Sequence, residues 1–161
     1  FFFKFFFLFI FFFFKKKKNE ACFLECLRNG DINKLKDYFE EENVDVNWKS
    51  SYFEETSFFV GCQNGRLEIV EYMLASIRVL DIFSKDYRKI LPSEIAKINS
   101  ELQEKLDHEK EDKEIKQRQS NCLSIYNLLQ EYQSNPKEVK IRLRKKLNLK
   151  GTIYIYFIFD I

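Results

Sequence analysis

Residues 64–74 read NGRLEIVEYML, and residues 29–39 read NGDINKLKDYF. The two stretches begin with the same Asn-Gly pair and lie 35 positions apart. Three apolar positions also coincide at this offset: Ile32 with Leu67, Leu35 with Val70, and Phe39 with Leu74. Several agreements at one offset indicate an internal repeat, and this repeat restricts the fold more than any other feature of the sequence.

Each repeat predicts two helices joined by a turn. Glycine permits the left-handed backbone that ends a helix, so the first helix of each unit should end at Gly30 or Gly65. The apolar residues that follow have helical spacing and predict a second helix. A piece rich in β-branched and apolar residues comes next, at residues 44–47 and 80–83. A polar turn then leads to the following unit, and a third unit opens at Leu91.

The composition agrees with a small helical domain. The chain has 161 residues, with only 4 Gly and 2 Pro, which argues against a turn-rich β fold and favours an all-α fold. Its net charge of +2 points to no particular partner. The four cysteines form no Cys-x-x-Cys pair, and with one histidine in the chain they do not predict a zinc site. We expect them to be small, half-buried side chains in a reducing compartment.

This order of helix, turn, helix and connecting segment resembles the ankyrin repeat family. In that family the connecting segment between units is called a finger. The second unit matches the family pattern at Thr56-Ser57-Phe58, Gly61-Cys62, GRLEIV (65–70), Met73-Leu74 and LDI (80–82). The first unit supplies GDI (30–32), Tyr38-Phe39 and VDVN (44–47), and the third opens with LPS (91–93) and Ile95-Ala96. The resemblance covers about residues 20–133. It implies an all-α, ankyrin-like helix-turn-helix solenoid of two to three units with short β-turn fingers.

The repeat departs from the family in three respects. Its period is 35 residues, whereas the family period is close to 33. The glycine expected in each finger is missing, because Phe53 or Glu54 stands there in one finger and Lys89 in the next. The usual histidine is absent from the start of every unit. These departures bear on the geometry of the fingers more than on the helices.

We divide the chain into four segments. They are a non-globular Phe/Lys-rich segment (1–18), an ankyrin-like repeat domain (19–133), a basic helix (134–150) and a hydrophobic tail (151–161). The repeats span about residues 21–55, 56–90 and 91–133, and the last one contains a charged insert at 99–119. The insert has no continuous apolar stripe, so we interpret it as two helix extensions or a solvated helical hairpin. A partner-recognising arm is the alternative.

The two end segments do not continue the repeat. The apolar part of residues 1–18 is shorter than the ~20 residues that a membrane helix needs, and it lacks a signal-peptide cleavage site. We therefore expect a fragment, or a reading frame that extends into DNA not normally translated; a membrane anchor with a basic flank is the alternative. Residues 151–161 have strand propensity but no second strand to pair with. They are interpreted as a tail or as the start of a further domain.

The resemblance implies that the fingers bind a partner. Repeat arrays present a concave surface to other molecules, and Trp, Tyr and Arg are enriched at the hot spots of interfaces. The expected partner-binding residues are Trp48, Lys49, Tyr52, Phe53, Lys85, Tyr87 and Arg88. Trp48 has a second interpretation, which is packing against the neighbouring finger, because Trp buries much apolar area wherever it can.

Residues 136–150 carry seven basic residues and one acid, and Val139, Leu143 and Leu147 share one helical face. One interpretation is a helix that docks on the last repeat and caps the array. The other is a basic patch for nucleic acid or acidic lipid, or a nuclear import signal. The patch would consist of Lys140, Arg142, Arg144, Lys145 and Lys146.

The sequence supplies no constellation for catalysis. Its one histidine, His108, lies in the charged insert, and its clustered acids lack the buried setting that would separate two pKa values. No Gly-rich phosphate loop is present. We therefore predict no catalytic, cofactor-binding or metal-binding residue, and expect a non-catalytic scaffold or adaptor that binds another protein in the cytoplasm or nucleus. The alternatives are binding of nucleic acid or an acidic membrane surface through helix 136–150, and an incomplete fragment of a larger ankyrin protein.

Overall fold

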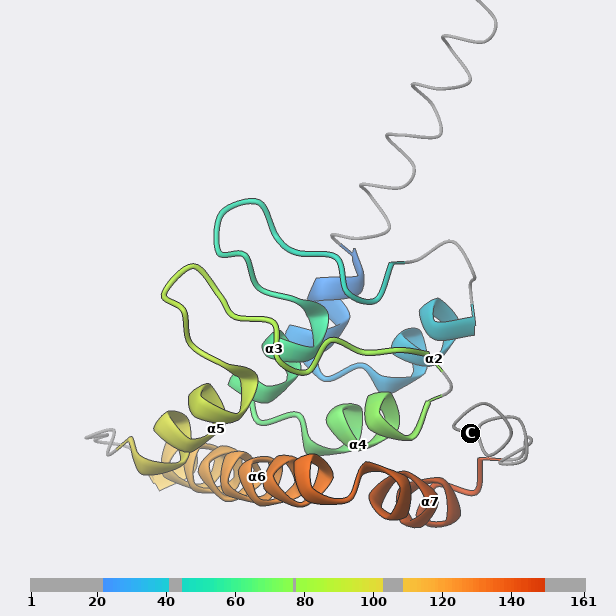
Figure 1. Ribbon diagram of the computed structural model, residues 1–161. Helices are drawn as coiled ribbons and strands as arrows, with labels where there is room; N and C mark the ends of the chain where they lie inside the picture. The colour runs from blue at the N-terminus through green and yellow to red at the C-terminus, as the bar shows by residue number, and fades with distance from the viewer. Residues whose placement is uncertain (1–21, 41–44, 77, 103–108, 150–161) are drawn as a thin grey trace, which may run out of the picture.

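The computed structural model describes residues 22–40, 45–76, 78–102 and 109–149 (Figure 1). A first helix covers residues 22–29. It is followed by α2 (Ile32–Glu40), α3 (Ser57–Gln63), α4 (Leu67–Ala75), α5 (Pro92–Glu101), α6 (Glu109–Ser134) and α7 (Pro136–Lys146). The described residues contain no β-strand, only an isolated bridge between Lys49 and Thr56. The prediction of an all-α fold is therefore confirmed for them, whereas segments 1–18 and 151–161 and His108 lie outside the described residues.

The helices form pairs joined by the predicted glycine turns. Helix 22–29 leads into α2 through Gly30, and α3 leads into α4 through Gly65. Both glycines have a positive φ, of 79° and 62° respectively. A left-handed residue here lets the chain reverse direction within one or two positions, so the second helix of each pair can lie against the first.

Local side-chain signals fix where several helices begin. The Thr56 hydroxyl accepts a hydrogen bond from the Phe59 backbone N–H at 3.2 Å and caps α3. The Glu94 carboxylate accepts from the Leu91 N–H at 2.7 Å at the start of α5. The Asn135 side chain accepts from the Glu138 N–H and caps α7. In each case a donor left free by the first helical turn gains a partner, which favours the helix start seen here.

The core is centred on α3. Six of its seven residues are buried, and Phe58 and Phe59 have no exposed surface. The apolar faces of helix 22–29, α2, α4, α5, α6 and α7 complete one continuous cluster around it. Because α3 is buried almost all round, its sequence SFFVGCQ shows no polar face.

The second and third helix pairs also satisfy carbonyl groups at the end of the first helix of the preceding pair. The Arg66 guanidinium donates to the Arg28 carbonyl, with Nε at 3.0 Å. The carbonyl of Gln63 accepts from the Asn99 amide at 2.7 Å and from the Arg118 side chain at 3.4 Å. Arg28 and Gln63 lie 35 positions apart, which is the repeat offset of the sequence. The carbonyls at equivalent helix ends are thus capped by residues of the following unit.

The helices α6 and α7 form a row along one side of the other helices (Figure 1). α6 packs along α5, and after a break at Asn135 the chain continues into α7, which packs on α4. The described parts of the charged insert are the last residues of α5 and the first part of α6. The insert therefore lengthens the third helix pair rather than forming a separate unit in the described residues.

The two fingers share a left-handed backbone position that no glycine marks in the sequence. Glu54 and Lys89 have positive φ values of 52° and 66°, and they lie 35 positions apart. These are positions at which the sequence comparison found the family's glycine to be missing. Residues other than glycine are uncommon in this region of φ because their Cβ atom approaches the backbone. Both fingers therefore adopt the left-handed conformation at equivalent positions without a glycine.

Replacing Lys89 with glycine should stabilise the chain. The substitution removes the left-handed strain, and we expect a gain of about 1 kcal/mol in the free energy of unfolding. The matched control is Lys85→Gly in the same finger, at an exposed lysine without a positive φ. It should lose stability through backbone entropy. Urea unfolding followed by circular dichroism measures both, and equal changes in the two variants would contradict the strained conformation.

Gly65 and Gly30 should differ in their tolerance of alanine. A Cβ atom at Gly65 would lie 2.8 Å from the backbone oxygen of Arg118, whereas at Gly30 it would face the movable side chain of Arg66 at 3.2 Å. Both variants incur left-handed strain of about 1–2 kcal/mol, but only Gly65→Ala also pushes α6 away. We expect a clearly lower urea midpoint for Gly65→Ala than for Gly30→Ala. A midpoint for Gly65→Ala at or above that of Gly30→Ala would refute the close approach of α6.

Candidate functional site

Two finger loops, residues 45–56 and 78–91, project side by side from the helices (Figure 1). The Tyr87 N–H donates to the Phe53 carbonyl at 3.0 Å. At the base of the loops the Asn47 side chain donates to the Val79 carbonyl and accepts from the Asp81 N–H, both at 2.9 Å. These bonds join the loops along their length, so the two fingers present one surface rather than two independent tips.

Aromatic side chains are exposed on this surface. Tyr52 is 89% exposed, and Phe53 and Tyr87 are about half exposed, at 50% and 51%. The rings of Phe53 and Tyr87 lie with centroids 5.8 Å apart, and the Arg88 guanidinium lies over the Tyr87 ring at 5.5 Å. Aromatic rings held in this way are already partly ordered before any partner arrives.

The structure brings together six of the seven residues that the sequence suggested for partner binding. They are the exposed residues Lys49, Tyr52, Phe53, Lys85, Tyr87 and Arg88, which we call the finger surface. Lys49 bridges the loops by donating to the Lys85 carbonyl at 3.4 Å. Trp48 is different, because it is partly buried and packs against the core. Trp48 therefore attaches the first finger to the core.

A buried carboxylate holds the second finger in shape. Asp86 has no exposed surface, and it accepts hydrogen bonds from the N–H groups of Arg88 at 3.0 Å and Ile90 at 2.9 Å. Its other oxygen pairs with the Arg88 Nε at 2.7 Å. Burial alone would raise the pKa of Asp86, but the Ile90 N–H and Arg88 lower it overall. Sequence reasoning missed this role, although an Asp two residues before Arg88 in a polar loop is typical of a side-chain-stabilised turn.

A second buried acid, Glu55, ends the first finger. Burial raises the pKa of Glu55, and the nearby Asp86 adds to this effect, while Arg28 and Arg88 oppose it. The protonated form of Glu55 is therefore more favourable in the folded state than in the unfolded chain. Its neighbour Glu54 is exposed, so the two acids have opposite surroundings although they are adjacent in the sequence.

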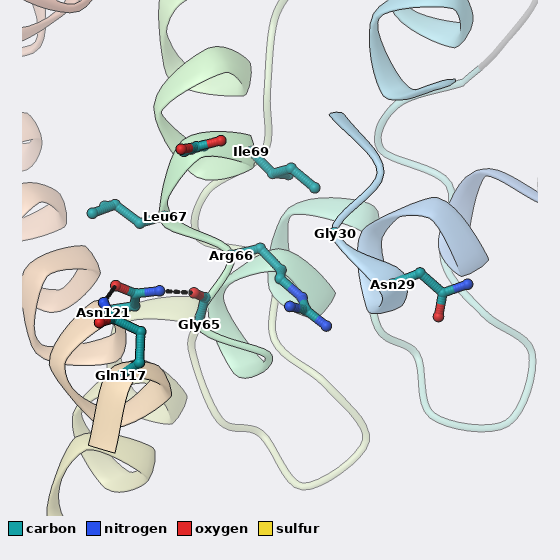
Figure 2. Close-up of a pocket in the computed structure, with 9 residues that line it drawn as sticks. Asn29, Gly30, Gly65, Arg66, Leu67, Ile69, Gln117 and Asn121 are labelled. Atoms are coloured by element: carbon teal, nitrogen blue, oxygen red, sulfur yellow. Dashed lines mark hydrogen bonds between the residues drawn. The ribbon is translucent and has the colours of Figure 1, made fainter. Parts of the chain in front are cut away.

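A polar pocket lies along the glycine turns that join the paired helices (Figure 2). It has a volume of about 330 Å³, and Asn29, Arg66, Glu68, Gln117 and Asn121 contribute polar groups to its lining. Figure 2 shows Asn121 next to Gly65, whose carbonyl accepts from the Asn121 amide at 3.0 Å. The Gln117 amide in turn donates to Asn121 at 3.0 Å. These groups join the units to one another, and we assign the pocket to the seam between them.

The predicted basic residues do not lie together on one open face. Arg144 is buried and donates to the Ala75 carbonyl at 2.9 Å, at the end of α4. Lys146 pairs with Glu71 at 2.7 Å, and Arg142 pairs with Glu131 on α6. Lys140 is half-buried, which lowers its pKa, and Lys145 is exposed. Val139 and Leu143 are buried and Leu147 is partly buried, so this helix is attached to the core by its apolar face.

The described residues contain no group of three His, Cys, Asp or Glu side chains that could hold a metal ion. All four cysteines are free thiols, and burial raises the pKa of Cys26, Cys62 and Cys122. Thiols in this state are poor nucleophiles at neutral pH. None of the described helices combines the length and the apolar character needed to cross a bilayer.

Comparison of the chain with protein-family models, with curated proteins and with solved structures gives no match.

Replacing Glu55 with glutamine should stabilise the chain at neutral pH. Because its folded-state pKa is raised, Glu55 favours folding most when protonated and loses that contribution as the pH rises through the folded pKa. Glu55→Gln should therefore raise the free energy of unfolding at pH 7. It should also flatten the change in stability between about pH 7 and pH 4.5. Glu54→Gln is the matched control and should follow the wild type; a wild-type pH profile in Glu55→Gln would contradict the buried setting.

Proposed function

We propose that the helix pairs are divergent ankyrin-like repeats stacked as a short solenoid, and that the chain is a non-catalytic module that binds another protein. Three regularities support the stacking. Left-handed residues recur at a spacing of 35 in the turns and in the fingers. Helix-end carbonyls of the first two units accept hydrogen bonds from the following unit. Adjacent fingers are joined to each other by backbone and side-chain hydrogen bonds.

The observation that carries the binding role is the exposed aromatic cluster of the finger surface. Phe53 and Tyr87 contact each other yet remain half exposed, and the Tyr52 side chain is almost fully exposed to solvent. Aromatic side chains dominate the energetics of many interfaces, and a partner that covers them removes a large apolar area from water. The hydrogen bonds between the fingers reduce the ordering that binding would require.

We assign the basic helix α7 to capping rather than to nucleic-acid binding. A phosphate-binding patch needs cations that face solvent and can replace counterions. In α7, two of the five candidate cations already pair with Glu71 and Glu131, and Arg144 is buried against the end of α4. These contacts use the charges within the protein. The apolar face of α7 meanwhile covers part of the stack, which a terminal element of a repeat array must do.

The test of the proposed function is a selection for peptide ligands. The full chain would be immobilised and exposed to a phage-displayed library of random dodecapeptides. We expect enriched clones whose affinity falls by at least about tenfold when Tyr52, Phe53 and Tyr87 are all replaced by alanine. The control variant replaces Ile98 and Leu123, which are exposed on α5 and α6, with alanine.

The two variants separate a finger site from other binding. Far-UV circular dichroism would first establish that each variant retains its helices, which is expected because all five side chains are exposed. Binding that survives the finger variant, or that is lost equally in the control, would place the site elsewhere. A library without enriched clones would count against a peptide-binding role.

A further inference from the structure

The finger tips expose more cations than acids. Within the finger tips, residues 48–54 and 84–89, the cations are Lys49, Lys85, Arg88 and Lys89, and all four are exposed. The acids of the same tips are Glu54 and Asp86. Asp86 is buried and used by Arg88, so Glu54 is the one acid that these tips expose. In the described part of the chain, none of Lys49, Lys85 and Lys89 forms an ion pair.

We infer that the finger surface recognises an acidic linear segment of its partner, in which carboxylates flank an aromatic or large aliphatic residue. This inference rests on the proposed function and names the class of partner. The apolar residue would cover the Phe53 and Tyr87 rings, whose centroids are 5.8 Å apart. The carboxylates would meet the ammonium groups of Lys49, Lys85 and Lys89 at the edge of the site. Apolar contact at the centre supplies affinity, and complementary charge at the rim supplies specificity and speeds association.

The size of the site favours a short segment over a broad domain surface. A stable interface between folded domains buries about 800 Å² on each partner. At the finger tips, 48–54 and 84–89, the exposed aromatic side chains are Tyr52, Phe53 and Tyr87, whereas Trp48 is partly buried and Asp86 is buried. A site of this extent suits one anchoring side chain and the charges on either side of it.

The arrangement of the rings favours a peptide over single-stranded nucleic acid. Base stacking needs open ring faces beside a continuous row of cations. One face of Tyr87 is covered by the Arg88 guanidinium at 5.5 Å, and Phe53 meets the ring at an angle of 54°. Arg88 itself is neutralised by Asp86. Tyr52 alone, with three lysines, would be a poor platform for successive bases.

The experiment analyses the composition of the peptides selected by the full chain from the random dodecapeptide library. We expect the finger-dependent clones to carry a net negative charge relative to the input library, and to contain an aromatic or large aliphatic residue among the acids. Their dissociation constants should rise several-fold between about 50 and 300 mM NaCl, because exposed ion pairs are screened by salt. Replacing Lys49, Lys85 and Lys89 together with glutamine should weaken binding by about tenfold.

The control lowers the net charge equally at another place. Lys113, Lys137 and Lys145 are exposed on α6 and α7, and their joint replacement with glutamine should change the affinity less than about twofold. Restoring the finger positions as arginine should recover binding of the acidic peptides.

The outcomes distinguish this inference from the proposed function. Finger-dependent clones that are neutral or basic would overturn the acidic preference and leave a peptide-binding finger surface intact. Clones that ignore the Tyr52, Phe53 and Tyr87 variant, or a library without enrichment, would overturn both. An oligothymidylate or phosphatidylserine vesicles that bind more tightly than the acidic clones, and do so through the three finger lysines, would assign the surface to that class of ligand instead.

Discussion

The helix α3 has seven residues, and six of them are buried. A helix of this length is not stable on its own in water, because too few hydrogen bonds follow the unfavourable first turn. It forms here because apolar side chains of the neighbouring helices cover it, and its first turn is capped by Thr56. The covering helices depend on α3 in turn, since none of the short pairs could bury its apolar face without a neighbour. The stability of the described helices therefore depends on their packing against one another.

The capping of helix ends also makes each unit depend on its neighbour. Arg66 satisfies the Arg28 carbonyl, and Asn99 satisfies the Gln63 carbonyl, so each unit completes the polar groups of the unit before it. The lengthened α6 continues this pattern through Arg118 and Asn121 at the second turn. α7 then adds a last layer on α4, held by Leu143 and by the bonds of Arg144. This dependence of one unit on the next explains how so few units can form a joined core.

The fingers combine local strain with firm support. Glu54 and Lys89 adopt a backbone conformation that costs about 1–3 kcal/mol in residues other than glycine. The conformation is maintained by the surrounding bonds, above all those of the buried Asp86 and the bond from Tyr87 to Phe53. Strain that is supported in this way often accompanies a functional surface. Here it accompanies the exposed rings of Tyr52, Phe53 and Tyr87.

The sequence by itself determined the helical class, the repeat of 35 residues and the turns at Gly30 and Gly65, because helix periodicity and left-handed glycine are local properties. Six of the seven residues that it suggested for partner binding are exposed in the fingers, but it included the partly buried Trp48 and left out the exposed Lys89. Only the tertiary structure decided that Glu55, Asp86 and Arg144 are buried, and that Arg142 and Lys146 of α7 form ion pairs with Glu131 and Glu71. Their surroundings come from elements far away in the chain, such as Ala75 for Arg144, and whether a charge is buried depends on those partners rather than on its sequence neighbours.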